Sequence, residues 1–339
     1  MRTTDGFDVP RTMNEPHEPG CSRTLPWPAG MKPLMLAPMQ GLTNQAMRSL
    51  FTEWVRPDVL FTEFMRVGNQ GGKPLAASDL REIGAEEGGI PLVVQLVGHG
   101  QEALVAAARV AQTAGARHLN LNLGCPYGRM TSGLTGGGML RSPELVAEIL
   151  PALRRVISGT FSVKLRAGYD DPQQIMGLLS MLEDSGIDYL VLHPRTVVQE
   201  YDGAADHRVT AQVVSQTRLP VIANGDIRTA ADGWRVLEQT GAAGLMLGRG
   251  AVADPLLFAR LRGEAPATLE QGDYAAMLRR YLRELLVRYG ELFCGDIQVL
   301  GKVKAVLACI DEPGLAKSLK QLRKARTIRS FVALLDELV

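Results

Sequence analysis

Residues 118–126 read HLNLNLGCP, a short leucine-rich run that stops at Gly124, Cys125 and Pro126. Seven similar apolar runs occur along the chain, and helical stretches such as Gln101–Ala114, Pro143–Val156, Pro172–Ser185 and Ala230–Glu238 lie between them. The eight runs are Pro33–Pro38, Val59–Phe64, Leu92–Val97, His118–Leu123, Phe161–Leu165, Tyr189–His193, Val221–Ala223 and Gly244–Leu247. Buried strands separated by helices indicate a parallel sheet covered on both faces. Eight such units predict an α/β fold, a (β/α)8 TIM barrel, over residues 31–265.

The chain continues on both sides of this predicted barrel. Residues 1–30 contain five prolines and no apolar periodicity, so we expect a disordered or loosely ordered extension. After residue 266 the strand pattern stops, and apolar residues from Tyr274 to Tyr289 recur at helical spacing. A helical pattern continues from about Ile297 to Leu338. The sequence therefore predicts a C-terminal all-helical domain at residues 266–339.

Composition narrows the class of protein. Hydrophobic residues make up 46% of the 339 residues, enough for a large core, and the net charge of +1 indicates no polyanionic partner by itself. The four cysteines include no C-x-x-C pair, and no cysteine–histidine spacing fits zinc, so we expect no metal site. The chain has no apolar run of about 18 residues and no signal-peptide core. We expect a cytoplasmic monomer with no membrane partner.

Polar residues gather at the predicted C-terminal ends of the strands, where barrel enzymes have their active sites. A polar group inside a packed strand is costly unless something pairs with it, so a whole rim of them indicates a ligand site. After the last two strands, Asn224-Gly225-Asp226 and Gly248-Arg249-Gly250 supply glycines for close backbone approach and one positive charge. These two loops favour a phosphorylated ligand.

Lys164, on the fifth predicted strand, allows two functional interpretations. It could form a Schiff base with a substrate carbonyl. It could instead place a positive charge beside the pyrimidine edge of a flavin. Gln95 and His193 favour the flavin, because they offer hydrogen-bond partners to a heteroaromatic edge. A structural lysine that bridges barrel carboxylates is the third alternative.

Cys125 follows Gly124 at a strand end and should face the site. A thiol there could donate a proton to a carbanion-like centre while a flavin donates hydride. A nucleophilic thiolate would need an activating base, and no His or Asp pattern nearby provides one. A buried, inert cysteine remains the alternative, and we assign Cys294 and Cys309 to that class.

The C-terminal region carries the clearest local charge in the chain. Between Leu300 and Ser330 there are eight basic residues against Asp311 and Glu312, a net charge of +6. The basic residues are Lys302, Lys304, Lys317, Lys320, Arg323, Lys324, Arg326 and Arg329. Such a segment is either a solvated helix face or a platform for a polyanion.

Seven short motifs between residues 36 and 250 anchor a resemblance that covers about residues 33–335. They are Leu36-Ala37-Pro38-Met39-Gln40-Gly41, Asn122-x-Gly124-Cys125-Pro126, Gly136-Gly137-Gly138-Met139-Leu140, Lys164-Leu165-Arg166, His193-x-Arg195-Thr196, Asn224-Gly225-Asp226 and Gly248-Arg249-Gly250. Together they resemble the tRNA-dihydrouridine synthase family. The run Thr62-Glu63-Phe64-Met65-Arg66-Val67 looks like the C-type bacterial branch, which modifies position 16 of tRNA. The resemblance implies an oxidoreductase that uses FMN and NADPH to reduce the uracil 5,6-double bond.

The resemblance also implies residue roles. Hydride would pass from the reduced flavin to uracil C6, and Cys125 would protonate C5. FMN would be held by Pro38, Met39, Gln40, Gln95, Lys164, His193, Asn224, Gly225, Asp226, Gly248 and Arg249. Asn122 would position the uracil, and Arg66, Arg195, Tyr201, Lys302 and Lys304 would contact the substrate or tRNA. A uridine in folded tRNA must be unstacked to reach a barrel mouth, which suits a basic helical platform.

The chain departs from the family pattern at three places. Tyr127 and Gly128 follow Cys125-Pro126, Gln40 stands where Glu is frequent, and Pro194 replaces a common glycine. These changes bear on the substrate loop, and hence on the target uridine. Two alternatives stay open: an FMN barrel that reduces a free pyrimidine, and a catalytically silent RNA-binding paralogue.

Overall fold

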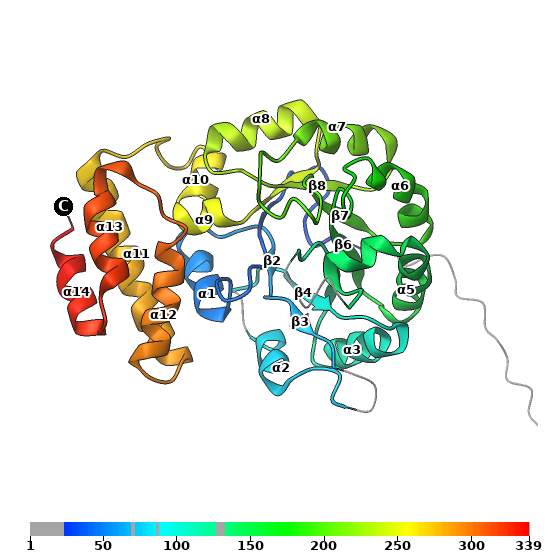
Figure 1. Cartoon of the computed structure of the whole chain (residues 1–339), viewed down its shortest axis with the longest axis horizontal. Helices are drawn as coiled ribbons and strands as arrows, with labels where there is room; N and C mark the ends of the chain where they lie inside the picture. Colours follow the sequence, from blue (N-terminus) through cyan, green and yellow to red (C-terminus); the bar gives the residue numbers. More distant parts are fainter. Residues whose placement is uncertain (1–23, 69–71, 86–87, 127–132, 339) are drawn as a thin grey trace, which may run out of the picture.

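The computed structural model describes residues 24–68, 72–85, 88–126 and 133–338 (Figure 1). Its strands are β1 Leu34–Leu36, β2 Leu60–Phe61, β3 Met65–Arg66, β4 Leu92–Val97, β5 His118–Leu123, β6 Thr160–Arg166, β7 Tyr189–His193, β8 Val221–Asn224 and β9 Gly244–Leu247. The helices that alternate with them are α1 Gln45–Trp54, α2 Ala77–Ile83, α3 Gln101–Thr113, α5 Pro143–Val156, α6 Gln174–Asp184, α7 His207–Gln216, α8 Ala230–Thr240, α9 Arg249–Ala253 and α10 Leu257–Arg262, with a 3-10 turn η1 at Gly136–Arg141. Apart from β3, the observed strands lie where the apolar runs predict them.

All paired strands run parallel, and the sheet closes into a barrel. The neighbour order is β1-β9-β8-β7-β6-β5-β4-β2, with β3 also paired to β4. The backbone N–H of Leu36 donates to the carbonyl of Val59 at 3.0 Å, which joins the two ends of the sheet. The predicted (β/α)8 barrel is confirmed.

The second barrel strand is interrupted, whereas the sequence predicts one run from Val59 to Phe64. The hydroxyl of Thr62 accepts the backbone N–H of Gln95 at 3.1 Å, at a point where a main-chain carbonyl would otherwise continue the ladder. Regular pairing resumes only at Met65, opposite Leu96. The interruption turns Glu63 and Phe64 out of the ladder at the C-terminal rim.

The base of the barrel interior is closed by an aromatic pair. Trp27 is buried and packs edge-on against Tyr189 of β7, with ring centroids 4.9 Å apart. The described end of the N-terminal segment, residues 24–30, is therefore fixed to the barrel and is not a loose extension. Residues 1–23 of the predicted extension lie outside the described residues.

The C-terminal region is helical, as predicted. It comprises α11 Gln271–Leu292, α12 Asp296–Leu307, a 3-10 turn η2 at Pro313–Leu315, α13 Ala316–Lys324 and α14 Ile328–Asp336. In Figure 1 these helices stand beside α1, α9 and α10 at one side of the barrel.

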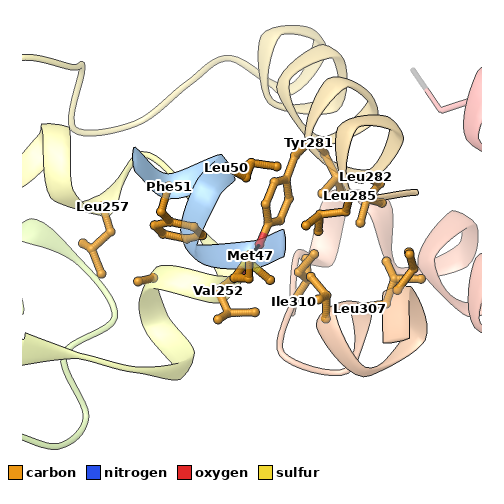
Figure 2. Packing of buried hydrophobic residues seen from close by; sticks show 14 of the residues in the cluster. Met47, Leu50, Phe51, Val252, Leu257, Tyr281, Leu282, Leu285, Leu307 and Ile310 are labelled. Atoms are coloured by element: carbon orange, nitrogen blue, oxygen red, sulfur yellow. Dashed lines mark hydrogen bonds between the residues drawn. The ribbon is translucent and has the colours of Figure 1, made fainter. Parts of the chain in front are cut away.

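The tail and the barrel share one hydrophobic cluster. Figure 2 shows Met47 and Leu50 of α1 beside Tyr281 of α11, while Phe51 lies on the opposite side of α1, toward Leu257. The hydroxyl of Tyr281 donates to the backbone carbonyl of Val252 at 3.2 Å, so the polar end of this ring is also satisfied. Because each fully buried large apolar side chain contributes about 1.5–3 kcal/mol, this cluster holds the tail in a fixed position on the barrel.

Candidate active site

A cavity of about 720 Å³ opens at the C-terminal ends of the barrel strands. This volume is typical of sites for cofactors and small ligands. Its lining residues come from the loops after almost every strand: Ala37, Pro38, Met39, Gln40, Leu42, Phe64, Arg66, Asn122, Gly124, Cys125, Pro126, Lys164, Arg166, His193, Tyr201, Asn224, Gly225, Asp226, Ile227, Arg228, Met246, Gly248, Arg249 and Gly250. The predicted rim of polar residues therefore surrounds one shared cavity.

Cys125 lies at the end of β5 and is held by its backbone. The side-chain oxygen of Asn122 accepts the N–H groups of Gly124 and Cys125 at 3.0 and 2.9 Å. The N–H of Gly137 donates to the carbonyl of Cys125 at 3.1 Å. A Cβ on Gly137 would lie 2.8 Å from that carbonyl oxygen and 2.7 Å from Val197, so only glycine allows this approach. The half-buried thiol is thus fixed at the cavity wall.

Arg166 supports the same loop from below, a role that the sequence interpretation did not assign. Its Nε donates to the carbonyl of Gly124 at 2.9 Å, and its Nη1 donates to the carbonyl of Thr196 at 2.8 Å. The guanidinium also lies 5.3 Å from the ring centroid of Tyr201. Alternation along β6 places Arg166 on the same face as Lys164, and that spacing could have identified it.

Lys164 is half-buried on β6 and points into the cavity. Burial, with the nearby charge of Arg166, lowers the pKa of its ammonium to about 8, and the proximity of Cys125 opposes this shift. Its ammonium has no hydrogen-bond or ion-pair partner in the part of the chain that the structure describes. The alternative of a lysine bridging barrel carboxylates therefore finds no support.

His193, at the end of β7, presents an unsatisfied polar atom. Its Nδ1 is buried and has no hydrogen-bond partner among residues 24–68, 72–85, 88–126 and 133–338. Burial, together with the charges of Lys164 and Arg166, holds the pKa of this ring well below its usual range, so the imidazole is neutral at neutral pH. A neutral ring facing a cavity can form a hydrogen bond with a ligand.

Asp226 organises the rim after β8. Its two carboxylate oxygens accept hydrogen bonds from Arg195 at 3.1 and 2.7 Å, and the N–H of Ala205 donates to it at 2.8 Å. Burial works to raise the pKa of Asp226, but these hydrogen bonds and the charges of Arg195 and Arg249 lower it on balance. Asp226 is therefore ionised at neutral pH.

Arg195 serves this rim and does not line the cavity. Besides Asp226, its guanidinium donates to the backbone carbonyls of Asp202 and Gly203. These bonds tie the loop that carries Tyr201 to the end of β8. Arg249 lies 4.3 Å from the centroid of the Tyr201 ring and 4.0 Å from the carboxylate of Asp226.

The loops after β8 and β9 require their glycines. Gly225 has φ +126°, and a Cβ on it would lie 3.2 Å from the ring of His193. A Cβ on Gly250 would lie 2.1 Å from the carbonyl oxygen of Ile227, which no relaxation of side chains could relieve. The side chain of Asn224 donates to the carbonyl of Met246 at 2.9 Å and so joins the two loops. Gly225, Gly248 and Gly250 line the cavity, and backbone without side chains at two adjacent loops suits an anionic group.

Besides Arg195, three other predicted site residues lie away from the cavity lining. Gln95 is fully buried and bonded to Asn120 and Asn122. Lys302, on α12, lies 3.5 Å from the carbonyl of Gly41 in the β1–α1 loop. Lys304 donates to the carbonyl of Ala325 inside the helical tail. The substrate-loop residues Tyr127 and Gly128 lie outside the described residues.

The exposed charge of the tail comes from other residues of its basic segment. Lys317, Lys320, Lys324, Arg326 and Arg329 are exposed on α13, α14 and the turn between them. Arg323 is also exposed, but its guanidinium donates to the carbonyls of Leu307 and Ile310 at the end of α12. Among the described residues no group of three or more His, Cys, Asp or Glu could hold a metal ion, and no helix is long and apolar enough to cross a membrane.

Comparison with known proteins identifies the family of this chain. A family model described as dihydrouridine synthase matches residues 35–311. A probable tRNA-dihydrouridine synthase of Rhodobacter capsulatus is 33% identical, over 78% of this chain and 85% of that protein. A tRNA-dihydrouridine(16) synthase of Cupriavidus necator is 34% identical, over 76% of this chain and 83% of that protein. A tRNA-dihydrouridine synthase B of Proteus vulgaris is 31% identical, over 76% and 81%.

Among solved structures, morphinone reductase superposes with a TM-score of 0.52 over 70% of this chain and 87% of that chain. At 14% identity this likeness concerns the barrel fold alone. The family assignment rests instead on the sequence relatives and on the family model, which spans most of the chain. The chain belongs to the dihydrouridine synthase family, flavin-dependent oxidoreductases that reduce uridine to dihydrouridine in tRNA.

Proposed function

We propose that this chain reduces uridine 16 of tRNA, with FMN as its flavin and NADPH as the reductant. We further propose that it works in the cytoplasm as a monomer, with residues 31–265 as the catalytic domain and residues 266–339 as a tRNA-binding domain. The observation that carries the proposal is the position of Cys125. Its thiol is fixed at the wall of the same cavity into which Lys164 and His193 project.

The residues of the cavity fit a flavin mononucleotide. The side chains of Lys164 and His193 line the cavity and offer an ammonium and a neutral imidazole to the heteroatoms of an isoalloxazine edge. Pro38, Met39 and Gln40 line one wall. Gly225, Gly248 and Arg249 offer backbone and charge to a phosphate. In this proposal Asn224 and Asp226 hold the loops after β8 and β9 in place through hydrogen bonds. Gln95 does not reach the cavity and contributes by its hydrogen bond to Asn122.

A flavin bound in this cavity would supply hydride for C6 of the uracil. Cys125 would donate its proton to C5, because its half-buried thiol lines the cavity and can act as a general acid there. Asn122 holds the two N–H groups that aim this thiol. The half-buried ammonium of Lys164 stabilises negative charge on the cofactor side. The C–H bond formed at C5 thus takes its proton from Cys125.

The mouth of the cavity suits a base that has been turned out of folded RNA. Arg66 is exposed beside Phe64, and Tyr201 is 40% exposed between the guanidinium groups of Arg166 and Arg249. Aromatic and guanidinium planes are the surfaces on which unstacked bases rest. Lys302 would add positive charge at the junction with the tail, and Lys304 would add it within the tail. These features favour whole tRNA over a free pyrimidine as the substrate.

The choice of position 16 is supported by relatives named for that position and by the Thr62–Val67 run. Relatives named synthase B match over a similar share of the chain, so the position needs its own test. Dihydrouridine should be mapped in tRNA from cells with and without this gene. Loss of dihydrouridine at position 16 alone is expected, and loss at another position would contradict the assignment.

The cofactors can be tested on the purified protein. We expect release of FMN on denaturation, reduction of the flavin by NADPH faster than by NADH, and reoxidation by unmodified tRNA under anaerobic conditions. A colourless protein, or a flavin that free uracil reoxidises as well as tRNA does, would reject the proposal in favour of one of the two alternatives.

A further inference from the structure

Beneath Cys125, four polar side chains form an unbroken row of hydrogen bonds across three strands. Asn122 Nδ2 donates to Gln95 Oε1, Gln95 Nε2 donates to Asn120 Oδ1, and Asn120 Nδ2 donates to Ser162 Oγ, each at 2.8 Å. Gln95 lies opposite Asn120, and Asn120 opposite Ser162, in the register of β4, β5 and β6. All four side chains are buried. Water therefore offers these amides little alternative pairing.

The direction of this row is fixed at both ends by the backbone. At one end the hydroxyl of Ser162 donates to the carbonyl of Leu119 at 3.4 Å. At the other end Asn122 Oδ1 accepts the N–H groups of Gly124 and Cys125. A carbonyl can only accept and an N–H can only donate. Each of the three amides between them is therefore held in one of its two possible orientations.

Reversal of any one amide would place two donors or two acceptors face to face. Because a buried polar group without a partner is costly, the amides keep their orientations together. The row thus transmits a constraint from β6 through β4 to the loop of Cys125. Asn120 and Ser162 do not line the cavity, so they cannot act on a substrate directly.

We propose that Asn120 and Ser162 are positioning residues for Cys125. Through Gln95 they orient the amide of Asn122, and Asn122 aims the thiol because its side-chain oxygen accepts the N–H groups of Gly124 and Cys125. The inference rests on the proposed function, in which Cys125 donates a proton to the uracil. It adds two residues that neither the motifs nor the cavity lining assigns to the reaction.

Ser162→Ala removes the last acceptor of the row without adding bulk. We expect the rate at which tRNA reoxidises the reduced flavin to fall threefold to tenfold, roughly the effect of one buried hydrogen bond. FMN affinity and the rate of flavin reduction by NADPH should stay unchanged, because the thiol takes no part in either. Asn120→Ala breaks the row at another link and should slow the same step, which keeps the test available if one variant folds poorly.

Thr160→Val is the matched control. Thr160 lies on β6 two residues before Ser162, is buried, and its hydroxyl lies 2.6 Å from Nδ1 of His118. The variant loses a buried hydrogen bond on the same strand but leaves the row intact. We expect no change in reoxidation by tRNA. Equal slowing in Thr160→Val and Ser162→Ala would overturn the inference, because it would reveal a general loss of strand order.

A double-mutant cycle tests whether Ser162 acts through Asn122. Once Asn122→Ala has removed the link to the thiol, Ser162→Ala should slow reoxidation no further. Slowing by the same factor in both backgrounds would mean independent effects and would refute the positioning role.

A second readout does not need the flavin. In flavin-free protein, alkylation by iodoacetamide can be followed at Cys125 by peptide mass spectrometry, with the exposed Cys294 as an internal reference. Ser162→Ala should raise the alkylation rate of Cys125 relative to Cys294 at least twofold, because the loosened loop exposes the thiol. An unchanged ratio in both Ser162→Ala and Asn120→Ala contradicts the inference.

The inference and the proposed function can fail separately. If Cys125→Ala reoxidises as fast as the unmodified enzyme, the proton-donor role fails. If Cys125→Ala is slow but Ser162→Ala and Asn120→Ala are not, only the positioning inference fails.

Discussion

At the scale of single residues, the peptide around Cys125 is fixed on three sides. The side-chain oxygen of Asn122 accepts the N–H of Cys125, and the N–H of Gly137 donates to the Cys125 carbonyl. Nε of Arg166 donates to the carbonyl of the preceding residue, Gly124. A thiol on so rigid a support can meet the same atom of a substrate in every turnover. This favours a role in proton transfer over that of a passive core cysteine.

Cys125→Ala tests that role. General acid catalysis contributes about 10²–10⁴-fold, so we expect turnover of tRNA to fall by this factor while FMN and tRNA still bind. The measurement is single-turnover reoxidation of reduced flavin by tRNA, with binding followed separately. Cys294→Ala, which alters an exposed cysteine at the turn between α11 and α12, is the control and should keep full activity.

Lys164 leads to a prediction about stability and pH. Its folded-state pKa of about 8 lies below the ordinary lysine value of 10.5, so between these pH values the unfolded chain binds more protons than the folded one. Stability of the flavin-free protein should therefore rise with pH across this window. Below pH 8 the buried ammonium destabilises the fold, by roughly 1–3 kcal/mol once partial exposure is allowed for.

Lys164→Met should accordingly stabilise the flavin-free protein at pH 7, and the gain should shrink as the pH approaches 10. Urea unfolding of both proteins at several pH values measures this difference. Lys317→Met, at an exposed position of α13, serves as the control and should change stability little at any of these pH values. A gain from Lys164→Met that grows with pH would contradict the assigned pKa shift.

At the scale of elements, two neighbouring loops depend on one close contact. The first turn of α9 passes so near the end of β8 that a Cβ on Gly250 would lie 2.1 Å from the oxygen of Ile227. Gly250 and Ile227 both lie in rigid backbone close to the ends of strands. The distance between the loops after β8 and β9 is therefore set by the absence of a side chain.

Gly250→Ala should push these loops apart and weaken FMN binding by about tenfold or more, because backbone N–H groups no longer converge on the phosphate. Equilibrium dialysis or flavin fluorescence gives the affinity. Gly177→Ala, in α6, has nothing within 4 Å of the new Cβ and is the control. We expect it to keep FMN affinity and to stabilise the helix by about 0.5–1 kcal/mol. Equal FMN affinity in both variants would argue against a phosphate at this site.

At the scale of the whole molecule, the helical tail is joined to the barrel by a continuous core. The cluster in Figure 2 runs from α1 to α11 without a polar break among its drawn residues. Lys302 also reaches from α12 to the Gly41 carbonyl, in the loop that follows β1. The orientation of the tail relative to the cavity mouth is thus built into the fold, which suits a rigid substrate such as tRNA.

The exposed lysines of the tail should carry part of the affinity for tRNA. Replacing Lys317, Lys320 and Lys324 by alanine should weaken tRNA binding and lower the slope of log Kd against log salt by about 2, because each lost phosphate contact removes nearly one released counterion. Arg109→Ala with Arg117→Ala removes exposed charges near α3 and is the control. An unchanged slope in the tail variant would reject the tail as an RNA platform.

The sequence alone determined the barrel and most of its rim. Strand positions followed from apolar runs bounded by glycine or polar residues, since a strand buried on both faces can tolerate little else. Cys125, Lys164, His193, Asp226 and Arg249 could be found because strand ends in a closed barrel converge on one mouth. The positions of the strands and of these rim residues therefore follow from local spacing along the sequence.

Only the tertiary structure decided what the rim residues contact. Arg195 turns to Asp226 and away from the cavity, Gln95 lies under the floor, and Lys304 bonds inside the tail. The buried position of Trp27 at the barrel base was equally hidden. These contacts join residues that are far apart in the chain, such as Arg195 with Asp226, and the same is true of Asn120 with Ser162. Spacing along the sequence brings such side chains to the same layer, but only closure of the sheet fixes which donor meets which acceptor.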